Sequence, residues 1–369
     1  MTDFRMKRPM IDRNVSLLLD QLQFATGNYL IVADENWAMV NWRDIRRRYS
    51  CNLTVVSNRY DIAQQAISAQ IETTFNDLDF NHLETNSFDG ILFRVSKERA
   101  SSHHVINKAV GLLKPKSSLI LSGSKNDGIK TYVKKTCDLF GMRSAAKKIG
   151  AQYIASISLY CDDLASLDDN NYSSIQSVKA LSQISLVTKP GIFGWNKIDR
   201  GSAFFVEHLP LFISNFSQRP RTMLDLGCGY GYLSSQAKFF GIEQLTATDN
   251  NAAAILVALE NLKCIVQDVQ VIASNAGDVI SQQFDTIWCN PPFHQGFTID
   301  GDLSSKFLAS TKRLLKPQGY AMFVVNSFIP LEQKAKEYFR SIEVVASNRS
   351  FKLVALGNQQ NNNNQQITK

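Results

Sequence analysis

The second half of the chain alternates short apolar runs with longer helix-like segments. An apolar run of about four to eight residues between turn signals is typical of a buried strand in a parallel sheet. The alternation of such runs with helices predicts βαβ units, and therefore an α/β fold. The predicted strands are residues 222–226, 245–248, 269–273 and 284–289, and residues 232–240 are predicted to form the helix after the first of them.

The same pattern appears in the first half of the chain. Three segments match in the same order in the two halves: residues 53–58 match 245–250, residues 88–91 match 284–287, and residues 112–115 match 314–317. The separation between matching segments drifts only slightly, as loop insertions in a duplicated fold would produce. The sequence therefore predicts two tandem Rossmann-like domains.

The chain is long enough for two such domains. Its 369 residues exceed the length of a typical single domain, and 44% of them are hydrophobic, which is ample for packed cores. Residues 162–177 are rich in Asp, Asn and Ser, and we interpret them as a surface connection between the copies. We expect a first domain at residues 1–160, a connection at 161–185, a second domain at 186–357 and a disordered Asn/Gln-rich tail at 358–369.

A glycine-rich loop, residues 225–231, follows the first predicted strand of the second copy. Its spacing is G-x-G-x-G, whereas the dinucleotide-binding turn is G-x-G-x-x-G. Tyr232 also stands where a dehydrogenase would need a small residue for helix packing. An acidic residue followed by G-x-G-x-G is typical of methyltransferases that bind S-adenosylmethionine, because glycines let the backbone pass close to the ligand.

The ends of the next two strands supply further cofactor candidates. Asp249 falls where a βαβ unit places a ribose-binding carboxylate, although a lone aspartate there is also a common helix cap. Asn275 falls where an adenine-contacting residue would lie, although it also fits a polar loop residue. The predicted cofactor-binding residues are Asp225, Gly227, Cys228, Gly229, Gly231, Asp249, Asn250, Asn275 and Asn290.

The segment Asn290-Pro291-Pro292-Phe293 ends the last predicted strand and carries the most specific signal. A planar NH2 group on a base is a poor nucleophile, because its lone pair is delocalised into the ring. The side-chain oxygen of Asn290 can accept one N–H bond, and the carbonyl of Pro291 can accept the other, since two prolines fix the backbone and offer no competing donor. Phe293 would stack on the ring. We therefore expect Asn290, Pro291, Pro292 and Phe293 to be catalytic in methyl transfer to such an amine.

The first copy lacks this set of residues. Ala33 to Trp37 stand where the second copy has its glycine loop, Ser57 stands for Asp249, and Arg94 to Lys97 stand for the Asn-Pro-Pro-Phe segment. We expect the first copy to keep the fold, to bind no cofactor, and to hold substrate or act as a scaffold. A short basic run, Arg43 with Arg46 to Arg48, fits either nucleic-acid contact or a solvated helix face.

Composition narrows the remaining classes. A net charge of +7 is compatible with a polyanionic partner without requiring one. The six cysteines form no C-x-x-C pair, so we expect neither a metal site nor a disulfide framework. No apolar run approaches the roughly eighteen residues of a membrane span, and we expect a cytoplasmic protein with no membrane partner.

The second half resembles the bacterial ribosomal RNA guanine-N2 methyltransferases, and the two-copy layout with an inactive first copy resembles the branch that modifies 16S rRNA. The resemblance rests on residues 190–193, 199–202, 225–231, 290–294, 325–330 and 350–352. It implies S-adenosylmethionine as the cofactor and the N2 amine of a guanosine in the small ribosomal subunit as the acceptor. The segments before the first strand are placed to fold over the pocket, and the substrate-binding residues that we expect are Lys189, Phe193, Ser202, Phe293 and His294. His294 also fits a surface role.

Several related functions stay open at this stage. The large-subunit rRNA guanine-N2 enzymes share the layout, and a protein glutamine also presents a planar NH2 group to such a site. A DNA amine is disfavoured, because no base-reading domain such as a helix-turn-helix is recognisable. A non-catalytic RNA-binding or ribosome-assembly module would leave the complete glycine loop of the second copy unexplained.

Overall fold

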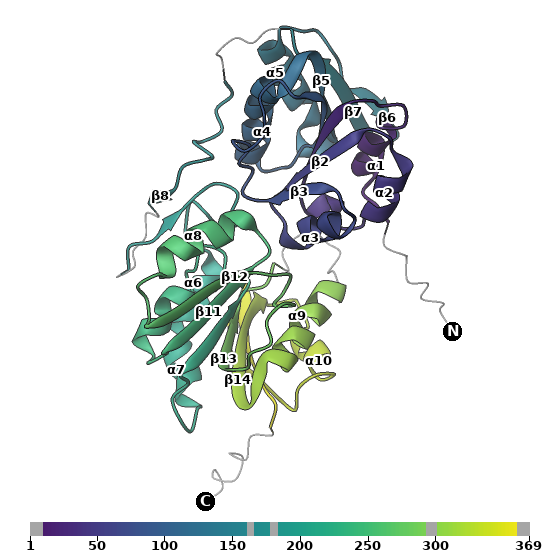
Figure 1. The fold of residues 1–369 in the computed structure, drawn as a ribbon. Helices are drawn as coiled ribbons and strands as arrows, with labels where there is room; N and C mark the ends of the chain where they lie inside the picture. The colour runs from purple at the N-terminus through teal and green to yellow at the C-terminus, as the bar shows by residue number, and fades with distance from the viewer. Residues whose placement is uncertain (1–9, 161–165, 178–183, 293–300, 360–369) are drawn as a thin grey trace, which may run out of the picture. The chain divides into compact units, whose positions relative to one another are not determined.

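The computed structural model describes residues 10–160, 166–177, 184–292 and 301–359. The chain divides into two compact units, Met1–Ser174 and Ile175–Lys369 (Figure 1). Each unit is an α/β fold around its own seven-stranded sheet.

The sheet of the first unit has the strand order β3-β2-β1-β4-β5-β7-β6. The first five strands in this order, β3, β2, β1, β4 and β5, are parallel to one another. Strand β7 runs antiparallel to both β5 and β6. The strands are β1 (Asn28–Ala33), β2 (Asn52–Ser57), β3 (Glu72–Phe75), β4 (Phe88–Arg94), β5 (Leu113–Ser124), β6 (Lys147–Ile149) and β7 (Gln152–Ser158). The helices are α1 (Arg13–Asp20), η1 (Glu35–Trp37), α2 (Trp42–Arg48), α3 (Tyr60–Ser68), α4 (Arg99–Leu112), η2 (Lys125–Asp127) and α5 (Ile129–Phe140), where η marks a 3₁₀ helix.

The second unit repeats this order as β12-β11-β10-β13-β14-β16-β15. Here β16 runs antiparallel to both β14 and β15. A separate two-stranded sheet joins β8 (Gln176–Ser177) to β9 (Val187–Thr188). The strands are β10 (Thr222–Leu226), β11 (Gln244–Asp249), β12 (Asp268–Ala273), β13 (Phe284–Cys289), β14 (Leu315–Asn326), β15 (Ser341–Ser347) and β16 (Phe351–Gly357). The helices are α6 (Arg200–Glu207), α7 (Leu209–Ser214), η3 (Ser234–Phe239), α8 (Ala252–Leu262), α9 (Gly301–Leu314) and α10 (Leu331–Ala335).

The shared strand order confirms the predicted duplication. The matching sequence segments form the same side-chain contacts in the two units. Asp89 and Lys114 belong to two of the repeated segments, and their side chains form an ion pair of 2.7 Å in the first unit. Asp285 and Lys316, their counterparts, form the same pair at 2.9 Å in the second unit. Asp89 accepts a hydrogen bond from the backbone at the start of β1, and Asp285 does so at the start of β10. The repeated segments therefore form the same ion pair and the same backbone hydrogen bond in both units, and these link three strands of each sheet.

Helices cover both faces of the second sheet (Figure 1), and the period of two along its strands provides both cores. Leu224 and Ile287 point to the face that α9 and α10 cover. Met223 and Trp288, one residue away in each strand, point to the face that α6, α7 and α8 cover. Because side chains on both faces of these strands are buried, the sequence of each strand is a nearly continuous apolar run.

Two local predictions differ from the structure. Residues 232–240 were expected to form one helix, but turns lead into the short η3, because the Ser234 hydroxyl bonds to Asp225 and the Ser235 hydroxyl bonds to the Tyr232 carbonyl. Such hydroxyl bonds compete with a regular α-helix. The connection is also not wholly at the surface. Tyr172 is fully buried in the first unit, where its hydroxyl donates to Asp77.

Candidate active site

The predicted site residues of the second unit come together at one edge of its sheet. Strands β10, β11 and β13 are parallel, so their carboxyl ends meet at this edge. The glycine loop follows β10, Asp249 ends β11, and Asn290 follows β13. In open α/β sheets this edge is where ligands bind.

The three glycines of the loop all have left-handed backbone conformations. Their φ angles are 85° at Gly227, 55° at Gly229 and 86° at Gly231. Residues with a Cβ adopt this region only at a cost, so glycine is required by the path of the chain. A Cβ on Gly231 would also lie 3.1 Å from the side chain of Leu262, whereas the nearest atom to a Cβ on Gly229 is Ile192 Cγ2 at 4.0 Å. The loop therefore packs on α8 at Gly231 and leaves room above Gly229.

Hydrogen bonds to the end of strand β11 hold the glycine loop in place. The amides of Gly227 and Cys228 both donate to the Thr248 carbonyl. The Gly229 amide donates to Asp249 Oδ2 at 2.9 Å, and Asp249 Oδ1 accepts from the Asn251 amide. Asp249 thus stabilises both the loop and the start of α8. Its two oxygens retain lone pairs for a ligand, because each can accept a second hydrogen bond.

Asp225 lies beneath the loop. Its side chain is fully buried, and its Oδ2 accepts from the amide and the hydroxyl of Ser234. Burial raises the pKa of this carboxyl to about 7, although the Ser234 hydrogen bonds oppose the shift. Its other oxygen has no hydrogen-bond partner within the described residues. The structure therefore places Asp225 as a support of the loop, with one buried acceptor left over.

The side chain of Asn290 has a fixed orientation. Its Nδ2 atom donates to Asp199 Oδ2 at 2.9 Å and to Ser202 Oγ at 2.7 Å. Both N–H groups of the amide are used in this way, which assigns the nitrogen and leaves Oδ1 as the acceptor. This is the orientation that an acceptor for a substrate amine requires.

The segment around Asp199 owes its position to two further contacts. Asp199 caps α6 by accepting from the Ser202 amide at 2.8 Å. A Cβ on Gly201 would lie 3.0 Å from Asp199 Oδ2 and 3.2 Å from the ring of Phe351 at the start of β16, so a larger residue would crowd both neighbours. The sequence identified this segment by resemblance, but assigned no role to Asp199. Its partner is 91 residues away in the chain, and no short-range pattern reveals such a contact.

The segment before α6 packs against the glycine loop. Asn261 on α8 exchanges two hydrogen bonds with the backbone of Val187 and also donates to the carbonyl of Tyr230. Asn251 donates to the carbonyl of Gly191 at 2.7 Å. Ile192 is buried with Tyr230 in a small cluster. Two asparagines of α8, neither of which the sequence singled out, therefore attach this segment to the cofactor side of the site.

The remaining predicted residues differ in exposure. Lys189 is 1% exposed, so its side chain lies inside the protein, whereas Phe193 is 68% exposed. Asn250 and Asn275 are both partly exposed after β11 and β12, and the Asn275 amide donates to Asp278. Pro291 is buried and Pro292 exposed. Phe293 and His294 lie outside the described residues.

The cysteines beside the two motifs are packing residues. Cys289 is fully buried in β13, and its thiol donates to the Leu226 carbonyl. Burial, reinforced by the carboxylates of Asp225 and Asp249, raises the pKa of both Cys228 and Cys289 well above the usual value. A protonated, buried thiol is a poor nucleophile. Among the described residues we also find no His, Cys, Asp or Glu cluster that could hold a metal, and no helix able to span a membrane.

The corresponding edge of the first unit is filled by its own side chains. Trp37, in place of Gly231, is fully buried and stacks on Trp42. Glu35 forms a 2.8 Å ion pair with Arg59, and Arg94 forms one of 3.1 Å with Asp127. Ser57 is buried and bonds to the backbone of Arg59. These residues pack and pair with one another at this edge, although Trp37 Nε1 and Arg94 Nε have no hydrogen-bond partner among the described residues.

Comparisons with known proteins agree with this geometry. Residues 183–355 match the family model of the methyltransferase small domain. The chain is 24% identical over 349 residues to the ribosomal RNA small subunit methyltransferase C of Shewanella loihica, which covers 87% of this chain and 98% of the relative. It is 28% identical to the protein of the same name from Erwinia tasmaniensis over 72% of this chain and 74% of the relative.

A solved structure shares the whole architecture. The 16S rRNA N2 G1207 methyltransferase of T. thermophilus, in complex with AdoMet and guanosine, superposes with a TM-score of 0.80 at 20% identity, over 95% of this chain and 93% of that one. At this identity the likeness concerns the fold, which confirms two tandem Rossmann-like methyltransferase domains. The second unit of the chain therefore matches the methyltransferase small domain family over residues 183–355, within a two-domain chain that is similar along its length to ribosomal RNA small subunit methyltransferase C.

Proposed function

We propose that this protein transfers a methyl group from S-adenosylmethionine to the exocyclic N2 amine of a guanosine in 16S rRNA. The observation that carries the proposal is the oriented amide of Asn290, whose nitrogen is held by Asp199 and Ser202 so that Oδ1 is left as an acceptor. The curated relatives bear the name of small-subunit rRNA enzymes, and the solved relative was captured with guanosine, which supports this acceptor.

The residues at the sheet edge fit the cofactor. The open space above Gly229 and the unpartnered buried oxygen of Asp225 belong to the glycine loop, and Asp249 at the end of β11 is bonded to the same loop. We assign the binding of the cofactor to the loop glycines with Cys228, and its ribose to Asp249. Asn250 and Asn275 are assigned to its adenosine part. When bound, the cofactor supplies an electrophilic methyl group on a cationic sulfur.

The protein's part in the reaction is to hold and desolvate the amine. Asn290 Oδ1 and the carbonyl of Pro291 would each accept one N–H of the guanine amine, which turns the nitrogen lone pair toward the methyl group. The C–S bond breaks as the N–C bond forms, and positive charge develops on the amine next to these two acceptors. The methylated amine is then acidic enough to release one proton to water. No covalent enzyme intermediate is needed.

The acceptor base must leave its stack to reach this edge. A base pair would occupy the N2 amine of guanine, so we propose that the RNA is unpaired or locally opened at the target. Phe293 is proposed to stack on the base, with His294 and Phe193 on the substrate side. Ser202 would act on the substrate through Asn290, and the buried side chain of Lys189 is assigned no direct contact with it. We propose that the protein acts in the cytoplasm on the small ribosomal subunit, and that the first unit contributes to holding this substrate.

A transfer assay tests the proposal. The purified protein is incubated with radiolabelled S-adenosylmethionine and, separately, with small subunits, large subunits, naked 16S rRNA or a glutamine-containing release factor. Digestion to nucleosides should recover the label as N2-methylguanosine from small subunits or 16S rRNA. Label in large subunits or in protein would contradict the assigned acceptor, and no transfer to any substrate would contradict the enzymatic function.

A further inference from the structure

One turn of the second unit presents an aromatic ring to solvent at the edge that holds Asn290. Phe328 is 71% exposed and lies just after β14. Strand β14 is parallel to β13, with Cys289 paired to Phe323, so both strands end at the same edge. Residue 326, the last of β14, pairs with Phe351, against which Gly201 packs. The turn is therefore joined to the Asn290 site through neighbouring strands and α6.

The turn that carries Phe328 is held in place. The Ile329 amide donates to the Asn326 carbonyl at 2.9 Å and closes the turn. The Ser327 amide donates to the Ser350 carbonyl, and the Ser327 hydroxyl donates to the Arg349 carbonyl. Ile329 itself is 2% exposed and anchors the end of the turn. The exposed ring thus stands on a fixed backbone, and the backbone of Arg349, an exposed residue, is bonded to the same turn.

Local stability does not account for a phenylalanine here. Central positions of turns favour Gly, Pro, Asn, Asp and Ser, and an exposed ring gains nothing from burial. The first unit provides an internal comparison, because β5 and β14 correspond strand for strand. There the two residues after the strand are Lys125 and Asn126, both exposed and polar. The aromatic residue is present only in the copy that has the glycine loop.

We infer that Phe328 is a stacking surface for a base that neighbours the target guanine in a single-stranded segment of RNA, and that Arg349 contacts the adjoining phosphate. Bases of unpaired RNA stack on exposed aromatic rings, and arginine pairs with phosphate. An exposed aromatic ring on a turn that is bonded to the backbone of an exposed arginine, at the edge where one base is to be modified, has the chemistry that such a strand requires. The inference rests on the proposed function and adds to it a second contact with the RNA.

Binding of a fluorescein-labelled single-stranded RNA oligonucleotide tests this inference without methyl transfer. Phe328→Asn, which takes the residue of the first unit and suits a turn, should weaken RNA binding by about tenfold. Phe328→Tyr should bind as the wild type does, because it keeps the ring. Arg349→Gln should reduce the slope of log affinity against log salt by about 0.7, the value for one phosphate contact on a single strand. Cofactor affinity should be unchanged in all three variants.

A matched control is Phe239→Ala, which removes a phenylalanine of the same unit that is 52% exposed on η3. Its RNA affinity should equal that of the wild type. The inference is overturned if the wild type does not bind the oligonucleotide, if Phe328→Asn binds it as tightly as the wild type, or if Phe328→Tyr loses as much as Phe328→Asn. These outcomes are independent of the transfer assay, so a protein that methylates RNA but is insensitive to Phe328 leaves the proposed function intact.

Discussion

At the scale of single residues, the site depends on how one amide is oriented. An asparagine can present either its oxygen or its nitrogen, and the two choices have opposite chemistry toward a substrate amine. Asp199 and Ser202 together remove this ambiguity by accepting both N–H bonds of Asn290. Asn290 itself could be predicted from its motif, whereas the two residues that orient it lie 91 and 88 positions away.

Substitutions at Asn290 and Ser202 should separate acceptance from orientation. Asn290→Ala should lower kcat by at least about a hundredfold, because the charge that develops on the amine loses one acceptor. Ser202→Ala should lower kcat by about tenfold, since one N–H of Asn290 loses its partner and the amide is then held by Asp199 alone. Both effects are measured as label transfer at saturating cofactor, alongside cofactor affinity, which should stay within a few-fold of wild type.

Ser214→Ala is the matched control for Ser202→Ala. Ser214 lies in α7 of the same unit, and its hydroxyl bonds only to the Leu211 carbonyl, so kcat should not change. Wild-type turnover in Asn290→Ala would remove the assigned role of the amide oxygen. Equal kcat values for Ser202→Ala and Ser214→Ala would show that the orientation of Asn290 does not depend on its hydrogen bond to Ser202.

Asp225 should make the stability of the cofactor-free protein depend on pH. Its pKa is raised by burial to about 7, well above the roughly 3.9 of an unfolded chain, so the native state binds the proton more tightly. The free energy of unfolding should therefore fall as pH rises between about 4 and 7. Asp225→Asn is neutral throughout, and its melting temperature relative to wild type should rise across this range. A difference that is constant from pH 5 to pH 8 would contradict the assignment.

At the scale of elements, sequence pattern predicts the strands better than the connections between them. Residues 222–226 and 284–289 form strands with the predicted bounds, because burial on both faces leaves an apolar run with clear ends. The segment after the glycine loop is η3 and turns in place of the expected helix, because serine hydroxyls bond to nearby acceptors. The attachment of residues 187–192 to α8 depends on Asn251 and Asn261, whose partners are remote in the chain.

The glycine loop gives a stability prediction at this scale. Gly231→Ala should lower the free energy of unfolding by at least about 1–2 kcal/mol, because its φ of 86° is unfavourable for alanine and the new Cβ would press on Leu262. Gly111 in α4 is the matched control, since no atom lies within 4 Å of its Cβ position. Gly111→Ala should stabilise by about 0.5–1 kcal/mol. Chemical denaturation measures both changes. The requirement for glycine at this position would be contradicted if Gly231→Ala destabilised the protein no more than an ordinary surface substitution does.

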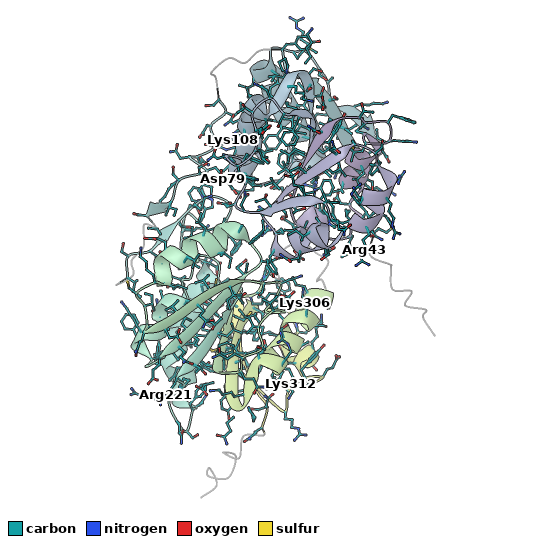
Figure 2. The ribbon with its side chains drawn as sticks, viewed as in Figure 1. Arg43, Asp79, Lys108, Arg221, Lys306 and Lys312 are labelled. Carbon is teal, nitrogen blue, oxygen red and sulfur yellow. The ribbon has the colours of Figure 1, made fainter. Side chains whose placement is uncertain are left out.

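At the scale of the whole molecule, the two copies share one fold but differ in the side chains at the edge of the sheet. Both keep the strand order and the Asp–Lys pair that fastens the sheet, so the features that stabilise the fold have been retained. The first copy fills its sheet edge with Trp37 and two ion pairs. It also exposes four arginines on α2, one of which, Arg43, projects at the surface of the unit (Figure 2). We propose that the first copy binds no cofactor and offers this basic surface to RNA.

Cofactor stoichiometry tests this division of roles. Titration calorimetry should give one S-adenosylmethionine site per chain, because only the second unit combines left-handed glycines with a carboxylate at the end of its second strand. Asp249→Ala should weaken binding by at least about tenfold, since it removes both the proposed ribose contact and the acceptor for the Gly229 amide. Ser57→Ala, at the corresponding position of the first unit, should leave affinity and stoichiometry unchanged, because the hydroxyl of Ser57 bonds within the described residues to the backbone of Arg59. Two sites per chain, or equal losses in the two variants, would mean that the first copy still binds the cofactor and that its filled edge opens in solution.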